Sequence, residues 1–166
     1  MPAATYVLTL PGPILRRGFW LYVWRVETDQ GEKLYVGRTG DNSSPHASAP
    51  YQRMGQHLGR AKTQNALRRT LKKYEIIPEN CAQFHFISHG PLYDEIASEI
   101  GATRDARMAK HLPLRDIVGA MEKALADGLR SAGYDVLNTV NCNWPLDQDL
   151  WAPVRSAFAV HFPRLS

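Results

Sequence analysis

The sequence predicts an α+β domain with a small, mostly antiparallel three-stranded sheet flanked by helices. Two observations lead to this prediction. The chain has 166 residues, of which 44% are hydrophobic and 22% are charged, which is typical of a single globular domain. Along it, runs rich in β-branched and aromatic residues come first, followed by segments with helical periodicity, a further strand and further helices.

The strands are predicted from alternation and from turn residues. Residues 19–26 and 33–37 are aromatic and β-branched runs around a short polar loop that contains glycine, which is typical of a β-hairpin. Residues 82–88 alternate between apolar and polar side chains, as in a half-buried strand. A further short strand is expected over 4–10, and the Pro-Gly-Pro sequence at 11–13 ends it.

The helices are predicted from the spacing of apolar residues. They are expected at about 51–58, 63–74, 92–100 and 113–131, with a last one after Pro145. The clearest is 113–131, where an apolar stripe follows one helix face until Gly133 ends the helix. Residues 40–50 consist of loop-forming residues, 134–140 form a short extended piece, and 101–112 fit no element.

Positive charge gathers in one stretch of the sequence. The chain has a formal net charge of +4, and there is no Asp or Glu between Tyr51 and Tyr74. The seven basic residues in that stretch are Arg53, Arg60, Lys62, Arg68, Arg69, Lys72 and Lys73. Because a globular surface normally mixes the two signs, the stretch predicts a surface that binds the phosphates of a polyanion. A solvated helix face is the simpler alternative.

Other features argue against several classes of protein. No apolar run approaches the roughly 18–20 residues that cross a bilayer. The N-terminal residues lack a cationic start and contain Pro11 and Pro13, which disfavours a secretory signal. The two cysteines, Cys81 and Cys142, form no CxxC pair and have no nearby His at zinc-finger spacing. We therefore expect a reduced, cytoplasmic protein with no membrane partner.

Three groups of polar residues have spacings that suggest chemistry. Alternation along the hairpin places Tyr22 and Tyr35 on the same side of the sheet. Arg53 and His57 are four residues apart and share one face of a helix. Glu122 flanks the apolar stripe of the long predicted helix. Taken singly, tyrosines on strands are usually core residues, and the other three side chains are usually solvated.

Taken together and in order, these residues resemble the motifs of the GIY-YIG nuclease family. The two short motifs correspond to 20–22, Trp-Leu-Tyr, which retains only the tyrosine, and to 35–37, Tyr-Val-Gly. The family pattern then has an Arg and a His four residues apart, a Glu on a later helix and an Asn further along. The matching residues here are Arg53, His57, Glu122 and Asn138. Residues 40–50 look like an insertion relative to this pattern.

The resemblance covers about residues 19–138 and implies a nuclease domain there. It leaves an N-terminal extension at 1–18 and a C-terminal extension at 139–166 that packs on the core. The implied activity is a metal-dependent endonuclease that hydrolyses DNA phosphodiester bonds with a single metal ion. Glu122 would be the metal ligand, and the ion would be Mg²⁺ or its substitute Mn²⁺.

The resemblance also implies roles for the other residues. Arg53 would hold phosphate oxygens through its planar guanidinium, and Arg38 would contact phosphate as well. Tyr22 would be the general base or would orient it, with Tyr35 and His57 as alternatives. Two further residues would have structural roles near the site: Gly37 and Asn138.

Two other interpretations remain open. One is a catalytically inactive domain that keeps only nucleic-acid binding, and the other is an unrelated basic interaction domain whose tyrosines are core residues. In the second case the side chains would not converge in the structure. The resemblance alone favours DNA over RNA, and the sequence does not indicate the oligomeric state. Trp144 and Trp151 are expected to pack in the protein rather than to stack on bases.

Overall fold

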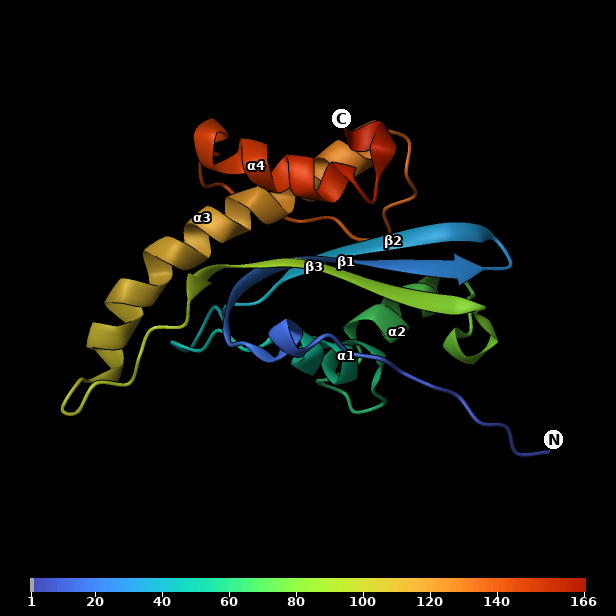
Figure 1. Ribbon diagram of the computed structural model, residues 1–166, viewed down its shortest axis with the longest axis horizontal. Coiled ribbons are helices and arrows are strands. Elements are labelled where there is room, and N and C mark those ends of the chain that lie inside the picture. Colours follow the sequence, from blue (N-terminus) through green and yellow to red (C-terminus); the bar gives the residue numbers. More distant parts are fainter. Residues whose placement is uncertain (1) are drawn as a thin grey trace.

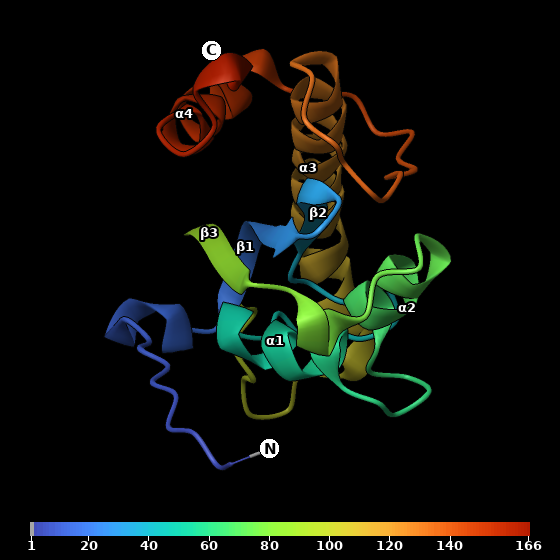
Figure 2. The same ribbon diagram turned by 90° about the vertical axis from the view of Figure 1, so that its right-hand side faces the viewer.

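A three-stranded antiparallel sheet separates two layers of helices. The computed structural model describes residues 2–166, and its strands are β1 (Gly18–Thr28), β2 (Gly31–Arg38) and β3 (Gln83–Asp94). The helices are α1 (Pro50–Leu58), α2 (Ala66–Lys73), α3 (Arg104–Ser131) and α4 (Gln148–Ala159), with short 3₁₀ helices at Gly12–Leu15, Pro78–Asn80 and Pro163–Leu165. The strand order is β2-β1-β3. α3 and α4 lie on one side of the sheet, and α1 and α2 lie on the other (Figure 1, Figure 2).

The predicted hairpin forms, and its strands are longer than expected. β1 and β2 are joined by a two-residue turn at 29–30, and the antiparallel pairing includes every residue of β2. In this register Trp24 lies opposite Tyr35, and Tyr22 lies opposite Gly37. Because directly opposite residues of an antiparallel pair project to the same side, these four residues share one face of the sheet.

Two of the predicted elements are wrong. Residues 4–10 form no strand but run as exposed chain, in which Tyr6 is 90% exposed. Residues 92–100 are not helical, because β3 continues to Asp94 by pairing with Gly18 and Phe19 at the start of β1. Both errors have the same physical cause: a strand depends on a partner that is distant in the sequence, which a local pattern does not reveal.

The aromatic face of the hairpin packs against α1 and α2. The buried residues in this layer are Tyr22, Trp24, Val26, Leu67, Leu71, Ile76 and Leu137. α2 contributes Leu67 and Leu71, which are four residues apart and so lie on one side of the helix. Pro50 lies in the first turn of α1. A backbone N–H has no partner within the helix at this position, so the proline removes no helical hydrogen bond.

The opposite face packs against α3 and α4 and holds the larger part of the core. Its buried residues include Phe19, Leu21, Val23, Leu34 and Val36 of the hairpin, Val118, Met121, Leu125 and Leu129 of α3, and Trp151, Val154 and Phe158 of α4. α3 begins earlier than predicted, because Thr103 caps it by accepting a hydrogen bond from Ala106 N at 3.1 Å. Pro113 therefore lies inside the helix and not at its start. No helix in the described chain is both long and apolar enough to cross a bilayer.

A segment after α3 covers the outer edge of β2. Leu34 N donates to Asp135 O, and Leu137 N donates to Leu34 O, each at 2.8 Å. The Asn138 side chain continues this pairing: its Nδ2 donates to Val36 O at 2.8 Å, and its Oδ1 accepts from Val36 N at 2.9 Å. The amide of Asn138 therefore takes the place of a backbone peptide and fixes the segment along the strand.

Candidate active site

The two hairpin tyrosines meet a histidine of α1 on the aromatic face of the sheet. Tyr22 Oη and His57 Nε2 are 2.9 Å apart and hydrogen-bonded, and the two side chains are buried. Tyr35 lies beside the same imidazole, with the ring centroids 5.2 Å apart and the planes at 88°. The structure therefore brings these three side chains together from β1, β2 and α1.

Gly37 provides the space for this arrangement. The phenol ring of Tyr22 lies across the Gly37 backbone, and a Cβ atom at Gly37 would collide with that ring and its hydroxyl. Gly37 is not among the residues with positive φ, so its backbone does not itself require glycine. The absence of a side chain is thus what matters at this position.

Burial keeps the imidazole and both phenols neutral near pH 7. Burial, with a smaller contribution from the positive charge of Arg53, lowers the pKa of His57 to about 4. Burial also raises the pKa of Tyr22 and of Tyr35, and the negative charge of Glu122 acts in the same direction. A neutral hydrogen-bonded pair of this kind can transfer a proton but resists holding a net charge.

Glu122 of α3 approaches the site together with the last residue of β2. Its Oε2 lies 3.1 Å from Nε of Arg38, and the two side chains are 17% and 14% exposed. Burial raises the pKa of Glu122, while the positive charges of Arg38 and Arg53 oppose that shift. A cleft of about 310 Å³ opens in front of the carboxylate. It is lined by Arg38, Gly40, Asp41, Asn42, Arg53 and Glu122.

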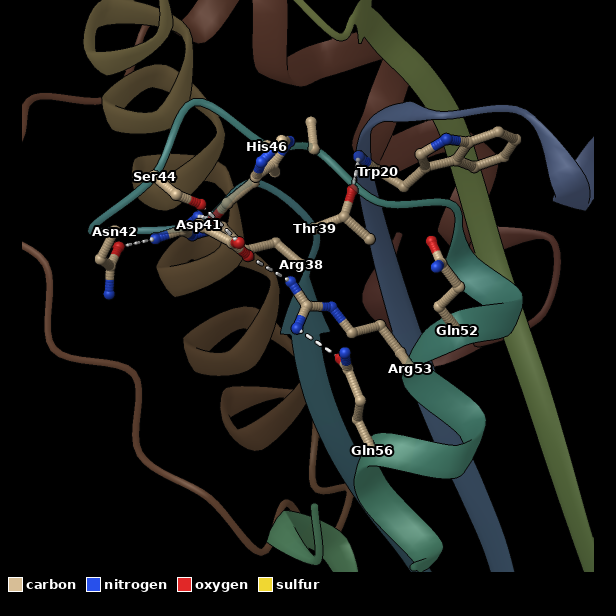
Figure 3. A network of polar contacts seen from close by, with 12 residues as sticks. Trp20, Arg38, Thr39, Asp41, Asn42, Ser44, His46, Gln52, Arg53 and Gln56 are labelled. Atoms are coloured by element: carbon tan, nitrogen blue, oxygen red, sulfur yellow. Dashed lines mark hydrogen bonds and ion pairs between the residues drawn. The ribbon is translucent and has the colours of Figure 1, made fainter. Parts of the chain in front are cut away.

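Arg53 is held at this cleft by two side chains (Figure 3). Its Nη1 donates to Gln56 Oε1 at 2.7 Å, and its Nη2 donates to Asp41 Oδ1 at 3.3 Å. Its Nε–H is buried and has no hydrogen-bond partner within residues 2–166. The guanidinium is therefore oriented by the protein, and its planar set of donors is of the kind that binds phosphate oxygens.

The neutral and charged groups are close enough to act on one another. The positive charge of Arg53 lowers the pKa of Tyr22, and the negative charge of Glu122 raises it. The negative charge of Glu122 likewise raises the pKa of Tyr35, and the positive charge of Arg53 lowers it. The two groups of side chains therefore lie near each other and are not scattered over the domain.

Sequence reasoning missed the residues that position the 40–50 loop. Asp41, the carboxylate partner of Arg53, lies in this loop. The loop is fixed by α3: Nε2 of the fully buried His111 donates to Asp41 O at 2.8 Å, and Arg115 Nη1 donates to Asn42 O at 3.3 Å. These partners are separated by about 70 residues in the sequence, and no motif spacing connects them.

The predicted cluster of basic residues is partly neutralised. Glu79, beyond the acid-free stretch, accepts hydrogen bonds from Arg60 at 3.1 Å and from Arg68 at 2.8 Å through its Oε1. Four others are exposed and form no ion pair within the described chain: Lys62, Arg69, Lys72 and Lys73. Arg69 is the one nearest the site, since its positive charge lowers the pKa of Tyr35.

The donors at Glu122 suit a hard divalent cation that takes most of its ligands from water and substrate. Within residues 2–166 only Arg38 pairs with the carboxylate, which opens onto the cleft. Because burial disfavours the ionised form of Glu122, a cation beside it would stabilise that form. The same residues contain no group of three or more His, Cys, Asp or Glu side chains placed to share an ion. A single carboxylate with water and phosphate oxygens is a common environment for Mg²⁺.

Comparisons with known proteins returned no relative. No family model, no curated protein and no solved structure matches this chain. The resemblance to the GIY-YIG nucleases accordingly rests on the motif residues themselves.

Proposed function

We propose that this protein is a metal-dependent endonuclease that hydrolyses DNA phosphodiester bonds with a single divalent ion, as the GIY-YIG nucleases do. The observation that carries the proposal is the convergence of five side chains from four elements on one site. They are Tyr22 of β1, Tyr35 of β2, Arg53 and His57 of α1, and Glu122 of α3. Together they supply a proton path, a positive charge for the phosphate and a carboxylate for the ion.

The phosphate lies in the cleft between Arg53 and Glu122. Arg53 offers it a fixed planar set of N–H donors, and Asp41 and Gln56 keep that guanidinium from turning away. Arg38 fixes the orientation of the Glu122 carboxylate through their ion pair. When bound at Glu122, Mg²⁺ supplies Lewis-acid stabilisation to the phosphoryl oxygen and to the leaving oxygen.

Tyr22 and His57 move the proton of the attacking water. In the Nδ1–H tautomer of His57, Nε2 accepts the hydrogen bond from Tyr22 Oη. As the water oxygen bonds to phosphorus, Tyr22 takes the water proton and passes its own proton to His57. The resulting imidazolium, whose pKa is lowered to about 4, returns this proton to solvent after the cleavage. The bond from phosphorus to the sugar oxygen breaks, and that oxygen leaves with the electron pair and takes a proton from solvent. Tyr22 remains a phenol throughout, which suits a hydroxyl whose pKa is raised by burial.

The proposal is tested by nicking of supercoiled plasmid DNA with Mg²⁺ or with EDTA. The wild-type protein cuts with Mg²⁺ and not with EDTA. Glu122→Gln cuts about 10³-fold more slowly, because several kcal/mol of metal stabilisation is lost. The matched control is Glu99→Gln, since the Glu99 side chain is 68% exposed and pairs with Lys110 at 3.6 Å.

A nucleic-acid-binding domain without turnover is the second candidate. The exposed cations Lys62, Arg69, Lys72 and Lys73 favour it, because they bind phosphates whether or not cleavage follows. In that case wild type and Glu122→Gln bind duplex DNA equally in a mobility-shift assay and neither cuts. An RNA duplex of the same sequence, used as competitor, tests the preference for DNA.

A further inference from the structure

A second cleft adjoins the first one at Glu122. It measures about 390 Å³ and shares Arg38, Asn42 and Glu122 with the cleft in front of Arg53. Its other walls are the α3 residues Arg115, Asp116 and Gly119 and the segment Asn141–Trp144. None of these α3 and C-terminal residues belongs to the motifs that suggest nuclease activity. A substrate phosphate bound at Glu122 would therefore lie beside a second cleft, most of whose lining residues differ from those of the first.

Trp144 lines this second cleft and is an exposed residue. It is 56% exposed, whereas Trp151, the other C-terminal tryptophan, is 6% exposed and lies in the core. The expectation that both tryptophans pack in the protein is therefore wrong for Trp144. An exposed indole that lines a cleft offers a flat surface on which a nucleobase can stack, whatever the identity of that base.

The remaining lining suits a base better than a second phosphate. Two positive and two negative side chains line the cleft, Arg38 and Arg115 against Asp116 and Glu122, so their formal charges balance. The uncharged amides of Asn42, Asn141 and Asn143 lie among them. Such amides donate and accept hydrogen bonds, as the edges of unpaired bases require.

Gly119, a buried residue of α3, also lines this cleft. A Cβ atom there would meet Arg38 Nε and Cys142 Sγ, each at 3.7 Å, which is ordinary contact. Packing within the protein therefore does not require glycine at this position, although glycine in a helix interior costs about 1 kcal/mol relative to alanine. The space that Gly119 leaves in front of α3 is part of the cleft itself.

We propose that the second cleft binds a nucleobase that has left the duplex stack next to the scissile phosphate. The inference rests on the proposed nuclease function, and it names the substrate class: DNA with an unpaired base beside the cut, rather than uniform duplex. Taking a base out of a stack costs least where the base is already mismatched or unpaired. A bulged nucleotide therefore reaches Trp144 at less cost than a paired one.

The test measures binding in EDTA, so that cleavage plays no part. The probes are a perfect duplex and the same duplex with one bulged 2-aminopurine, whose fluorescence is quenched on stacking. Wild type binds the bulged duplex about tenfold more tightly than the perfect one and quenches the probe. Trp144→Ala brings the ratio of the two affinities close to one, and Trp144→Phe keeps most of the preference. Tyr6→Ala, which removes an exposed aromatic ring from the N-terminal segment, keeps the wild-type ratio.

A second variant fills the cleft without touching the tryptophan. Gly119→Met places a side chain in the open space and abolishes both the quenching and the preference for the bulge. Equal wild-type affinity for the two duplexes, or loss of affinity for both in Trp144→Ala, overturns the inference and leaves the nuclease proposal standing. A preference for the bulge in EDTA without cleavage in Mg²⁺ refutes the nuclease proposal and supports the base site.

Discussion

The two halves of the candidate site handle charge in opposite ways. Tyr22, Tyr35 and His57 are neutral and lie against α1, and burial shifts the pKa of each away from ionisation. Arg53 and Glu122 are each held by a partner of opposite charge and face a cleft, although burial also raises the pKa of Glu122. One half therefore relays a proton through groups that are neutral before the reaction, and the other can balance the charge of a phosphate.

The largest expected effect is in the charged half of the site, which consists of Arg53 and Glu122. Arg53→Ala lowers the rate of plasmid nicking about 10³-fold, because the guanidinium that faces the phosphate is lost. Arg53→Lys recovers only part of the rate, since an ammonium group cannot reproduce the planar donor set. If Arg53→Ala cuts at the wild-type rate, the charged half does not hold the phosphate.

In the neutral half of the site, which consists of Tyr22, Tyr35 and His57, the buried histidine is expected to make the protein less stable in acid. The pKa of His57 is about 4 in the folded protein and about 6.5 when unfolded. Below pH 6.5 the unfolded chain therefore binds the proton first, and the free energy of unfolding falls as the pH drops towards 4. The loss is about 3 kcal/mol, at 1.36 kcal/mol per pKa unit.

This effect is measured by urea unfolding at pH 7 and at pH 4. His57→Gln is the reference, because it lacks the titrating group and its stability falls by about 3 kcal/mol less between the two pH values. Equal losses in the two proteins would mean that His57 is not held neutral by burial.

Alanine substitutions at two glycines, Gly37 and Gly55, distinguish a steric effect on stability from an effect of helix propensity. Gly37→Ala pushes the Tyr22 ring aside, lowers the free energy of unfolding by about 1–3 kcal/mol and slows nicking. Gly55→Ala on α1 has nothing within 4 Å of the new Cβ and raises stability by up to about 1 kcal/mol. Thermal unfolding and nicking of both variants check this contrast. A change of stability in the same direction in Gly37→Ala and Gly55→Ala would contradict it.

The smallest expected effect concerns the surface cations. Arg69→Ala weakens DNA binding a few-fold and reduces the slope of log affinity against log salt by about 1, because one phosphate contact is lost. Arg60→Ala has less effect, since Arg60 is 82% exposed and already pairs with Glu79 at 3.1 Å. Mobility shifts over a range of salt concentrations compare the two variants. If the slope of log affinity against log salt is the same for Arg69→Ala and Arg60→Ala, Arg69 is no closer to the DNA than Arg60 is.

The predictable part of the site is the part that depends on local geometry. The period of two in the hairpin places Tyr22 and Tyr35 on one face, and the four-residue spacing in α1 places Arg53 and His57 together. The fold class follows from the same local patterns. These regularities act over a few residues, so they can be recognised in the sequence.

The unpredicted part depends on contacts between distant segments. The 101–112 segment fits no element from its sequence, yet it forms the start of α3, where buried His111 fixes the loop that carries Asp41. Glu79 neutralises two arginines from outside the acid-free stretch. The exposure of Trp144 is set by the path of the C-terminal segment. None of these pairings has a fixed spacing, so only the folded structure reveals them.

The central claim is that Glu122 holds the one divalent ion of the reaction. Electron paramagnetic resonance of Mn²⁺, with and without duplex DNA, measures this binding for wild type, Glu122→Gln and Tyr22→Phe. We expect one bound Mn²⁺ in wild type and in Tyr22→Phe, and none in Glu122→Gln. Equal Mn²⁺ binding by wild type and Glu122→Gln would contradict the account.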